Sequence, residues 1–546
     1  MVTPRTASQS SQSGSVPAPG GGSDRQRWIA LVGIALGVAL VIMDATIANV
    51  ALPVVIRDLG LTATETQWMN AIYSLVFAAL ILLAGRLSDI HGRRLMLLAG
   101  LTLFMLASLA VGSAPTPAFL IGARLVQGIG AAFVMPSTLS TINALFHGRE
   151  RAIAFAVYGS MIGGMAAVGP LLGGWLATDF SWRWAFWINI PFSLAAIVVA
   201  VRYVPETRDP NVRHGIDVPG TLLASIGMTA IVYGLIESSQ YGWLAGPSGE
   251  FSPVPWAIGG GLALMAAFVA VERRRERADL PVLAHLGMFA VPTFRYGLIA
   301  ALIVSLGEFG MLFVLPLLLQ GAMGYDAIHT GWIMMALAGG TFLSSGMVPR
   351  ATRRLGQRAV VRLGLALEAV AIAGLALALP TGHWQVAGIL AVYGVGVGLA
   401  TAQLTNTILE DVPVAQSGEA SGMTTTVRQI GTSLGIALLG GLLISGLTSG
   451  TRDGLEAAGA PPAVVDSLVE VVRESVGAAI PGLAADPATA QAADIAADAL
   501  IDAAKLTTGI AAGVLGIGVL ATIALPRREE DDDAAAPAPS SPAAAG

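Results

Sequence analysis

The chain has 546 residues, of which 54% are hydrophobic and only 12% charged, and it contains no cysteine. Soluble globular domains carry about 25% charged residues, so this composition excludes a soluble domain and a disordered protein. The lack of cysteine excludes a disulfide-stapled secreted scaffold. The net charge of -5 gives no indication of a nucleic-acid partner.

Apolar stretches long enough to cross a bilayer follow one another along the chain. A spanning helix needs about 20 mostly apolar residues, and these stretches lack the two-residue alternation of a barrel strand. The pattern predicts an all-α polytopic membrane protein. Fourteen spanning helices are predicted, at 28–56, 68–87, 95–113, 117–140, 153–177, 185–203, 217–237, 254–271, 295–319, 329–348, 359–379, 384–404, 421–447 and 506–525.

The distribution of basic residues predicts how the chain is oriented. If both termini are cytoplasmic, the cytoplasmic tails and loops hold 23 arginines, whereas the outer loops hold five basic residues. Arginine and lysine concentrate in the cytoplasmic loops of membrane proteins. We therefore expect a multi-pass protein of the bacterial plasma membrane with cytoplasmic N- and C-termini.

The spans group into two six-helix halves with an insertion between them. The loops after the second span of each half align Gly92 with Gly356, which indicates a weak internal repeat. Within the second half, 448–505 is predicted as a long extracellular loop, and its apolar stripe at 465–476 predicts a surface helix. The predicted segments are a disordered cytoplasmic tail, the N-terminal half, the two-helix insertion with its cytoplasmic linker, the C-terminal half and a second disordered tail, at 1–27, 28–204, 205–292, 293–525 and 526–546.

Five charged side chains inside the spans are the first candidates for function: Asp44, Arg124, Glu308, Glu368 and Arg428. A charge inside the bilayer is costly and marks a functional site by default. Asp44 lies about 24 Å into the first span at 1.5 Å per residue, where desolvation favours the neutral form of a carboxyl group. We therefore expect Asp44 to carry a proton; the alternative is a structural carboxylate that stays paired with an arginine.

The other four candidates differ in what their positions indicate. Arg124 lies at a depth similar to that of Asp44, so the two can pair, and protonation of Asp44 would leave Arg124 without its partner. A purely structural ion pair is the alternative. Glu308 lies near mid-depth, where it would attract a cationic substrate or a second proton, unless it is a protonated glutamic acid at a helix interface. For Glu368 and Arg428 the structural interpretation is favoured.

Catalytic and cofactor chemistry has little support in the sequence. The phosphate-binding loop of ATPases needs a lysine directly after a glycine, but the only lysine, Lys505, follows Ala504. The six histidines are scattered over loops without metal-ligand spacing. We therefore expect no enzyme activity, no metal, no cofactor and no ATP-driven pump in one chain.

Four short motifs complete the pattern. The loop after the second span contains Gly85, Arg86, Asp89, Gly92, Arg93 and Arg94. The fourth span contains Arg124, Gln127, Gly128 and Gly130, and the fifth contains Gly169, Pro170, Gly173 and Gly174. The first span contains Asp44, Thr46, Asn49 and Pro53. In this order and these positions, the motifs resemble those of the major facilitator superfamily, specifically its fourteen-span drug:proton antiporters, over about residues 28–525.

The resemblance implies an alternating-access exporter with the major facilitator fold, in which two six-helix halves rock around a central cavity. It implies that the loop at 85–94 is a gate, in which Asp89 latches the cytoplasmic side onto the positive N-terminal end of the span that starts near Ser421. It also associates Arg124 with proton coupling and the fifth-span motif with antiport. In the second half Arg353 takes the place of Asp89, so a symmetric latch is not expected.

The predicted function is export of drugs or of lipophilic, cationic small molecules by proton antiport. One alternative is a narrow exporter of an endogenous antibiotic, metabolite or lipid, and a more remote one is a membrane sensor that transports nothing. The predicted partners are the small-molecule substrate, protons and the lipid bilayer, with no nucleic acid. The protein is expected to act as a monomer.

Overall fold

The computed structural model describes residues 24–146, 148–207, 215, 217–244, 251–412 and 417–523. Thirteen helices in this part of the chain are long and apolar enough to cross a membrane. A further helix of 32 residues, α5, spans Gly148–Asp179, although several of its side chains are not described. The predicted all-α membrane fold is confirmed. Of the two predicted tails, only 24–27 is described, and it forms the start of the first helix.

The N-terminal half is built from six long helices and one short one. Polar residues start two of them: Thr62 and Glu65 form a capping box at α2, and Thr116 caps α4 just before Pro117. These caps satisfy backbone N–H groups at helix ends that the bilayer could not satisfy. The helices are α1 Asp24–Leu59, α2 Ala63–His91, α3 Arg93–Gly112, α4 Pro117–Leu145, α5 Gly148–Asp179, α6 Trp184–Trp187 and α7 Asn189–Tyr203.

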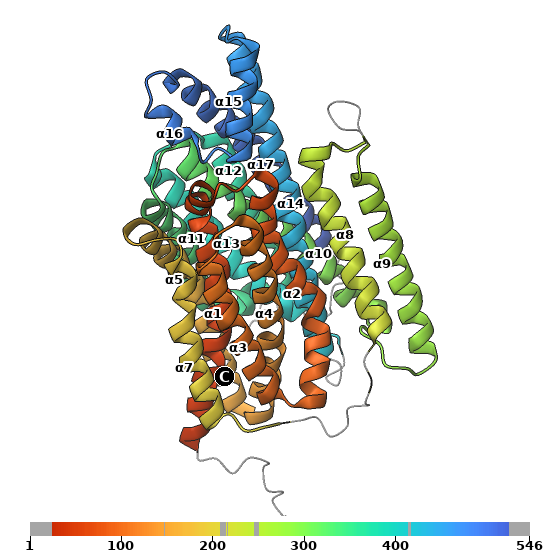
Figure 1. Ribbon diagram of the computed structural model, residues 1–546. Helices are drawn as coiled ribbons and strands as arrows, with labels where there is room; N and C mark the ends of the chain where they lie inside the picture. Colours follow the sequence, from red (N-terminus) through yellow and green to blue (C-terminus); the bar gives the residue numbers. More distant parts are fainter. Residues whose placement is uncertain are drawn as a thin grey trace, which may run out of the picture.

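The insertion is a hairpin of α8, Val218–Tyr241, and α9, Val254–Arg277, at the side of the bundle (Figure 1). Helix α8 packs against α2 and α14, and the Trp68 indole donates a hydrogen bond to Glu237 on α8 at 3.4 Å. In the 18-residue apolar stretch of α9, only 11% is buried inside the protein. The hairpin therefore attaches through α8 and leaves α9 at the periphery.

The C-terminal half contains two helices that are longer than predicted. Helices α14 and α17 extend beyond the predicted spans 421–447 and 506–525, and they carry α15 and α16 at one end of the molecule (Figure 1). The segment 448–505 is therefore mostly helical, and its expected surface helix is α15. The elements are η1 Leu286–Ala290, α10 Pro292–Leu317, η2 Leu318–Ala322, α11 Ala327–Leu355, α12 Gln357–Ala378, α13 His383–Leu409, α14 Ser417–Ala457, α15 Pro462–Glu474, α16 Ile480–Ala484 and α17 Ala490–Ile523.

Matching turns support the internal repeat. Gly92 alone separates α2 from α3, and Gly356 alone separates α11 from α12. Their φ angles are +120° and +79°, in the region that favours glycine. The two residues that the sequence aligned therefore make the same kind of turn between the second and third long helices of each half.

The two halves touch at the end of the bundle that carries α15 and α16, which we call the cap side; the opposite end, where α1 begins, is the tail side (Figure 1). The Gln320 amide donates a hydrogen bond to the Val50 carbonyl at 3.0 Å. The Ile328 backbone N–H donates to the Thr178 hydroxyl at 3.1 Å. Helix α5 packs along α11 and α2 along α14, so the halves are closed against each other on the cap side.

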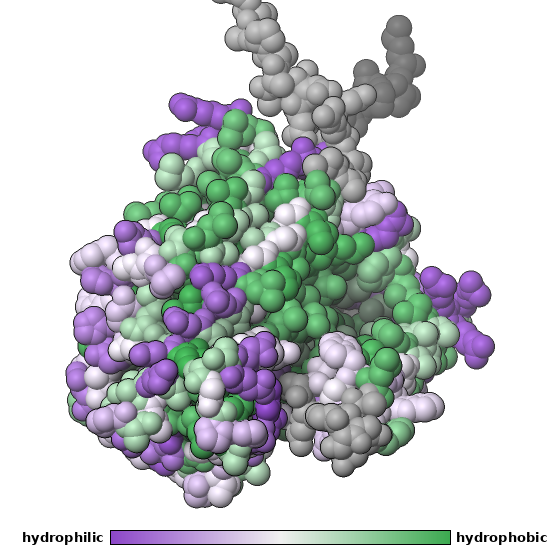
Figure 2. Space-filling model, turned by 90° about the horizontal axis from the view of Figure 1, so that it is seen from above, coloured by the Kyte–Doolittle hydropathy of each residue, from purple (hydrophilic) through white to green (hydrophobic). Residues whose placement is uncertain are grey.

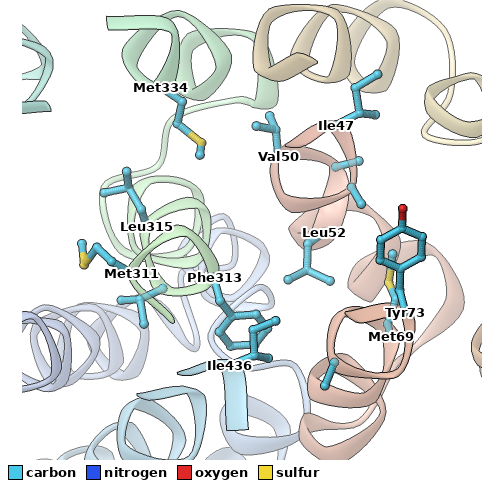
Figure 3. Close-up of a cluster of buried hydrophobic side chains, with 14 of the residues drawn as sticks. Ile47, Val50, Leu52, Met69, Tyr73, Met311, Phe313, Leu315, Met334 and Ile436 are labelled. Carbon is cyan, nitrogen blue, oxygen red and sulfur yellow. The ribbon is translucent and has the colours of Figure 1, made fainter. Parts of the chain in front are cut away.

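Apolar side chains fill the space between the halves near these contacts. Figure 3 shows them on α1 and α2 on one side and on α10, α11 and α14 on the other, with Leu52, Phe313 and Ile436 around the space between the helices. Their burial keeps water out of this part of the bundle. The labelled members are Ile47, Val50, Leu52, Met69, Tyr73, Met311, Phe313, Leu315, Met334 and Ile436.

The outer surface also suits a bilayer. Large apolar side chains stand exposed on the helices, among them Leu377, Val370 and Trp384. Seen from above, the molecule shows hydrophilic patches beside a broad apolar area (Figure 2). Exposed apolar surface on this scale is costly in water and is expected of helices that face lipid.

Candidate transport site

An ion pair lies buried in the middle of the N-terminal half. Asp44 projects from α1 and Arg124 from α4, and an Arg124 guanidinium nitrogen lies 2.6 Å from Asp44 Oδ2. The two residues are 0% and 1% exposed. The pairing that their similar depths permitted is therefore present, and both charges are removed from solvent.

Three polar side chains complete the surroundings of the carboxylate. The amides of Gln127 on α4 and Asn189 on α7 each donate a hydrogen bond to Asp44 Oδ1 at 2.8 Å. The Gln127 amide also donates to the Ser108 hydroxyl on α3 at 2.9 Å. We call Asp44, Arg124, Gln127, Asn189 and Ser108 the N-half cluster. It ties four helices of the N-terminal half together.

The guanidinium of Arg124 is also held on its other sides. It donates hydrogen bonds to the Gln127 side-chain oxygen at 2.7 Å and to the Met69 carbonyl at 3.3 Å. It lies over the ring of Tyr73, 4.5 Å from the ring centroid. A cation over an aromatic face is favoured where water is absent, so α2 helps to keep this charge in place.

Hydrogen bonds hold the Asp44 carboxyl group on both of its oxygens in this conformation. Its two oxygens accept three hydrogen bonds, one of them from a cation, and such charge-assisted bonds are about twice as strong as neutral ones. Separating Arg124 from Asp44 would leave both side chains buried without their partner. Breaking a buried pair on one side is unfavourable by about 3–5 kcal/mol, which makes this pair a two-state element.

The other residues of the first-span motif support α1. The Thr46 hydroxyl donates to the Met43 carbonyl at 2.9 Å, and Asn49 accepts a hydrogen bond from the Asn70 amide at 3.2 Å. Pro53 lies inside the helix. These residues shape α1 and join it to α2, but the hydrogen bonds described here do not involve Asp44.

The fifth-span motif forms close contacts between helices. A Cβ atom at Gly173 would lie 3.0 Å from the Ile47 carbonyl of α1, and one at Gly169 would collide with Thr46. Gly174 faces the Ala327 carbonyl of α11 in the other half. Because only glycine permits such approach, the motif places α5 between the helix that carries Asp44 and the opposing half.

The two glycines of the fourth-span motif have a similar role. A Cβ atom at Gly128 would lie 2.7 Å from the Tyr73 carbonyl of α2, and one at Gly130 would lie 2.7 Å from the Phe104 backbone nitrogen of α3. Helix α4 therefore packs closely on both neighbours, which brings Arg124 within reach of Asp44.

The residues of the predicted gating loop lie on the tail side, but most of them are helical. The segment 85–91 belongs to α2 and 93–94 to α3, so only Gly92 forms a turn. Gly85 faces Pro136 of α4, and Arg86 donates a hydrogen bond to the Gly215 carbonyl at 3.4 Å. The backbone N–H groups of Arg93 and Arg94 donate to the Thr207 carbonyl and to Glu206, at 3.0 and 3.1 Å. The side chain of Asp89 lies outside the described part of the protein, so its predicted latch contact stays a prediction.

Glu308 lies apart from the N-half cluster. It is on α10 in the other half, where it interacts electrostatically with Arg428 of α14. Arg428 also interacts with Glu368 of α12. The structure therefore separates the residues grouped in the sequence as proton-coupling candidates into two sites, and it joins Glu308 to two residues for which a structural role was favoured.

Two members of the N-half cluster were missed as site residues. Asn189 lies at the start of α7 and Ser108 near the end of α3. Both are polar residues in apolar helices, which is the signal that could have drawn attention to them. That signal is weak for single hydroxyls and amides, because many of them hydrogen-bond to their own helix. Over the described residues, no group of three or more His, Asp or Glu could hold a metal ion.

Comparison with known proteins supports this architecture. The Major Facilitator Superfamily model matches residues 34–436. The probable actinorhodin transporter of Streptomyces coelicolor is 34% identical, with 82% of this chain and 80% of the relative covered. The puromycin resistance protein pur8 of Streptomyces alboniger is 37% identical, with 77% and 82% covered. The multidrug efflux pump LfrA of Mycolicibacterium smegmatis is 31% identical, with 91% and 95% covered.

Solved structures share the fold. An inward-facing bacterial homologue of the human lysosomal transporter Spinster superposes with a TM-score of 0.61 at 15% identity, over 92% of this chain and 98% of the other. With the family model covering most of the chain and curated relatives above 30% identity, the protein belongs to the Major Facilitator Superfamily.

Proposed function

We propose that this protein is a secondary transporter of the bacterial plasma membrane that exports drugs or other lipophilic small molecules in exchange for protons. It works as a monomer, without enzymatic chemistry and without a cofactor, and it uses the proton gradient. The arginine bias of the loops supports a cytoplasmic tail side and an extracellular cap side. The contacts of Gln320 with Val50 and of Ile328 with Thr178 then close the extracellular side in this conformation.

The buried Asp44–Arg124 pair is the observation that carries the proton-coupling part of the proposal. It holds two opposite charges inside a bundle that the relatives use for export, and it is stable only while both are charged. Protonation of Asp44 releases Arg124, and the close contacts of α5 with α1 and α11 pass this change to the other half. The proton therefore biases which side of the bundle is open.

A narrow exporter of one natural product is the second candidate. Among the relatives are the probable actinorhodin transporter, a puromycin resistance protein and the cephamycin export protein CmcT of Amycolatopsis lactamdurans. Each of these names points to one compound, whereas LfrA is named as a multidrug pump. Both candidates share the proton-coupled mechanism and differ only in the breadth of substrates.

The test uses everted membrane vesicles that contain the full chain and hold an acid interior. A panel of lipophilic cations, such as ethidium and tetraphenylphosphonium, and of neutral antibiotics is added while proton efflux is followed by fluorescence. We expect several compounds to release protons, and Asp44→Asn to abolish the release. Release by a single compound class would favour the narrow exporter.

Controls separate coupling from folding. The amount of Asp44→Asn in the vesicles is measured, and Asp44→Glu is tested beside it, because a glutamate keeps the ionisable group and restores part of the release. Proton efflux that persists unchanged in Asp44→Asn would contradict the role proposed for Asp44. If no compound moves protons in the wild-type vesicles, proton antiport itself is wrong.

A further inference from the structure

A second group of ionisable side chains, partly or fully buried, lies in the C-terminal half. Glu308 comes from α10, Glu368 from α12, Tyr393 from α13 and Arg428 from α14. Both glutamates interact electrostatically with Arg428 and with the Tyr393 hydroxyl. We call these four residues the C-half cluster. The helices that carry them approach closely, since a Cβ atom at Gly396 of α13 would lie 2.7 Å from Glu368 Cγ.

The C-half cluster is almost devoid of hydrogen bonds. Within the described part of the chain, neither carboxylate oxygen of Glu368 has a hydrogen-bond partner, nor has the Tyr393 hydroxyl. Both side chains are 0% exposed. Two nitrogens of the Arg428 guanidinium are likewise buried without a partner among these residues. An ionised carboxylate without partners is strongly disfavoured away from water, so Glu368 gains by taking up a proton.

The charges of the cluster do not balance without a further cation. Two carboxylates face one guanidinium, so the ionised cluster carries one excess negative charge. Helices α11 and α17 pack on α12, and they carry no titratable residue between His329 and Arg350 or after Lys505 within the described chain. On α12 itself, Arg362 lies six residues before Glu368 and donates a hydrogen bond to the Thr522 carbonyl of α17 at 3.2 Å. One bound proton makes the cluster neutral, and an organic cation would do the same.

Access to the cluster is uneven. Glu308 and Arg428 keep part of their surface exposed, whereas Glu368 is 0% exposed. Of the two carboxyl groups, only that of Glu308 therefore offers surface that a cation could contact. This separation gives the two carboxylates different tasks.

We propose that the C-half cluster is a second proton-binding site, in which Glu368 holds the proton and a cationic group of the substrate at Glu308 displaces it. Uptake forms an O–H bond between a water-borne proton and a Glu368 oxygen. When the cation arrives, that bond breaks and the proton returns to water through Glu308, so the cluster stays neutral. This inference deepens the proposed antiport function and rests on it for the direction of exchange.

The site makes one specific demand on substrates. Displacement needs a positive charge at Glu308, so a neutral drug would not release the proton of the C-half cluster. Transport of neutral compounds would then depend on the N-half cluster alone. Cationic and neutral substrates are therefore expected to differ in the number of protons released per molecule.

The test measures protonation directly, without transport. Infrared spectra of the purified full-length protein are recorded across a pH titration, and the carbonyl band of protonated carboxyl groups is followed. We expect Glu368→Gln to remove a titrating component that Asp44→Asn retains. Asp453→Asn, at an exposed position of α14, serves as the matched control and retains the component that Glu368→Gln removes.

A second measurement tests the displacement step. Tetraphenylphosphonium is added to the unbuffered protein, and proton release is measured together with binding. We expect release in the wild type and none in Glu368→Gln, whose affinity for the cation falls about tenfold or more, because one uncompensated charge then remains buried. Should Glu368→Gln fail to fold, Glu368→Asp is used, which keeps the proton but shifts its band.

Two results would overturn the inference. One is an infrared titration that is identical in the wild type and Glu368→Gln; the other is a proton release that survives Glu368→Gln but disappears in Asp44→Asn. In the second case the vesicle experiment would still show antiport, so the proposed function would stand while the C-half site would not. Conversely, if the Glu368 band is present but the protein transports none of the compounds, the C-half proton site would stand and the proposed transport function would be wrong.

Discussion

The N-half and C-half clusters both bury one arginine with acidic side chains, but they solve the problem in opposite ways. In the N-half cluster each oxygen of Asp44 accepts hydrogen bonds, and Arg124 is held by a carboxylate, a carbonyl and an aromatic ring. In the C-half cluster Glu368 has no hydrogen-bond partner among the described residues. A balanced ion pair stabilises one conformation, whereas a group with one excess negative charge favours the binding of a cation.

This difference indicates which change each cluster can undergo. The N-half cluster changes only if a strong pair is broken, so it suits a switch between two discrete conformations. The C-half cluster changes its protonation with little loss of contacts, so it suits binding and release. Charge alone in the sequence does not separate these roles, because both clusters read as charged residues in apolar spans.

The largest expected difference between the two clusters is in the stability of variants that lose an acidic side chain. Asp44→Asn leaves Arg124 buried without its counter-charge, and we expect the free energy of unfolding to fall by about 3–5 kcal/mol. Glu368→Gln replaces a proton-holding carboxyl group whose oxygens accept no hydrogen bond among the described residues, so we expect little change or a gain. Thermal unfolding of both variants in detergent measures the contrast.

The double variant Asp44→Asn with Arg124→Gln is the control for this prediction. It removes both charges of the pair and should recover part of the stability lost by Asp44→Asn alone, because no unpaired charge remains. Equal destabilisation by Asp44→Asn and Glu368→Gln would show that the two clusters do not differ in the way that their contacts indicate.

The next effect compares the packing around the clusters. A Cβ atom at Gly173 would press on α1 near Asp44, at 3.0 Å from the Ile47 carbonyl, whereas one at Gly339 of α11 meets nothing within 4 Å. We expect Gly173→Ala to cost about 1–3 kcal/mol and to reduce transport strongly. Gly339→Ala should leave both properties nearly unchanged. Unfolding midpoints and vesicle efflux measure them, and similar behaviour of the two variants would argue against a tight α1–α5 contact.

A smaller effect concerns the contact that joins the halves. Gln320→Leu removes the hydrogen bond to the Val50 carbonyl, worth about 1 kcal/mol, and should shift the population toward an open cap side by about fivefold. The chain has no cysteine, so a single cysteine replacing buried Leu52 reports this opening by its rate of maleimide labelling.

Gln357→Leu is the matched control for that change. Gln357 donates a comparable hydrogen bond to the Thr407 hydroxyl at 3.0 Å, but both residues belong to the C-terminal half. Its loss should leave the labelling rate at position 52 unaffected. A labelling rate that does not respond to Gln320→Leu would mean that this bond does not hold the cap side closed.

The smallest effect lies outside the bilayer, on α15. The Arg473 guanidinium donates hydrogen bonds to Glu470 and lowers the pKa of its carboxyl group. The stabilisation is therefore present above the unfolded-state pKa of Glu470 and is lost as the pH falls through its lowered folded-state pKa. We expect Glu470→Gln to destabilise by about 0.3 kcal/mol near neutral pH and to have no effect in strong acid. Unfolding measured at both pH values checks this, and a difference that persists in acid would contradict it.

The sequence could predict the transmembrane character and the Asp44–Arg124 pair. Long apolar stretches have few alternatives to spanning helices, because the bilayer satisfies no backbone polar group. A charge inside them is rare enough to stand out, and two opposite charges at equal depth have few other partners. The spans predicted for α14 and α17 were too short for a physical reason. Outside the bilayer a helix needs no apolar run, so the hydropathy pattern ends before the helix does.

The sequence alone indicates which side chains need a partner or a proton inside an apolar bundle: Asp44, Arg124, Glu308, Glu368 and Arg428. Which of these side chains contact one another depends on the tertiary structure. Helices α3, α4 and α7 bring Ser108, Gln127 and Asn189 around Asp44, while α10, α12 and α14 bring two glutamates to one arginine. The reason is that a helix fixes depth and direction along the sequence, but only the packing of helices fixes which side chains of equal depth share one site.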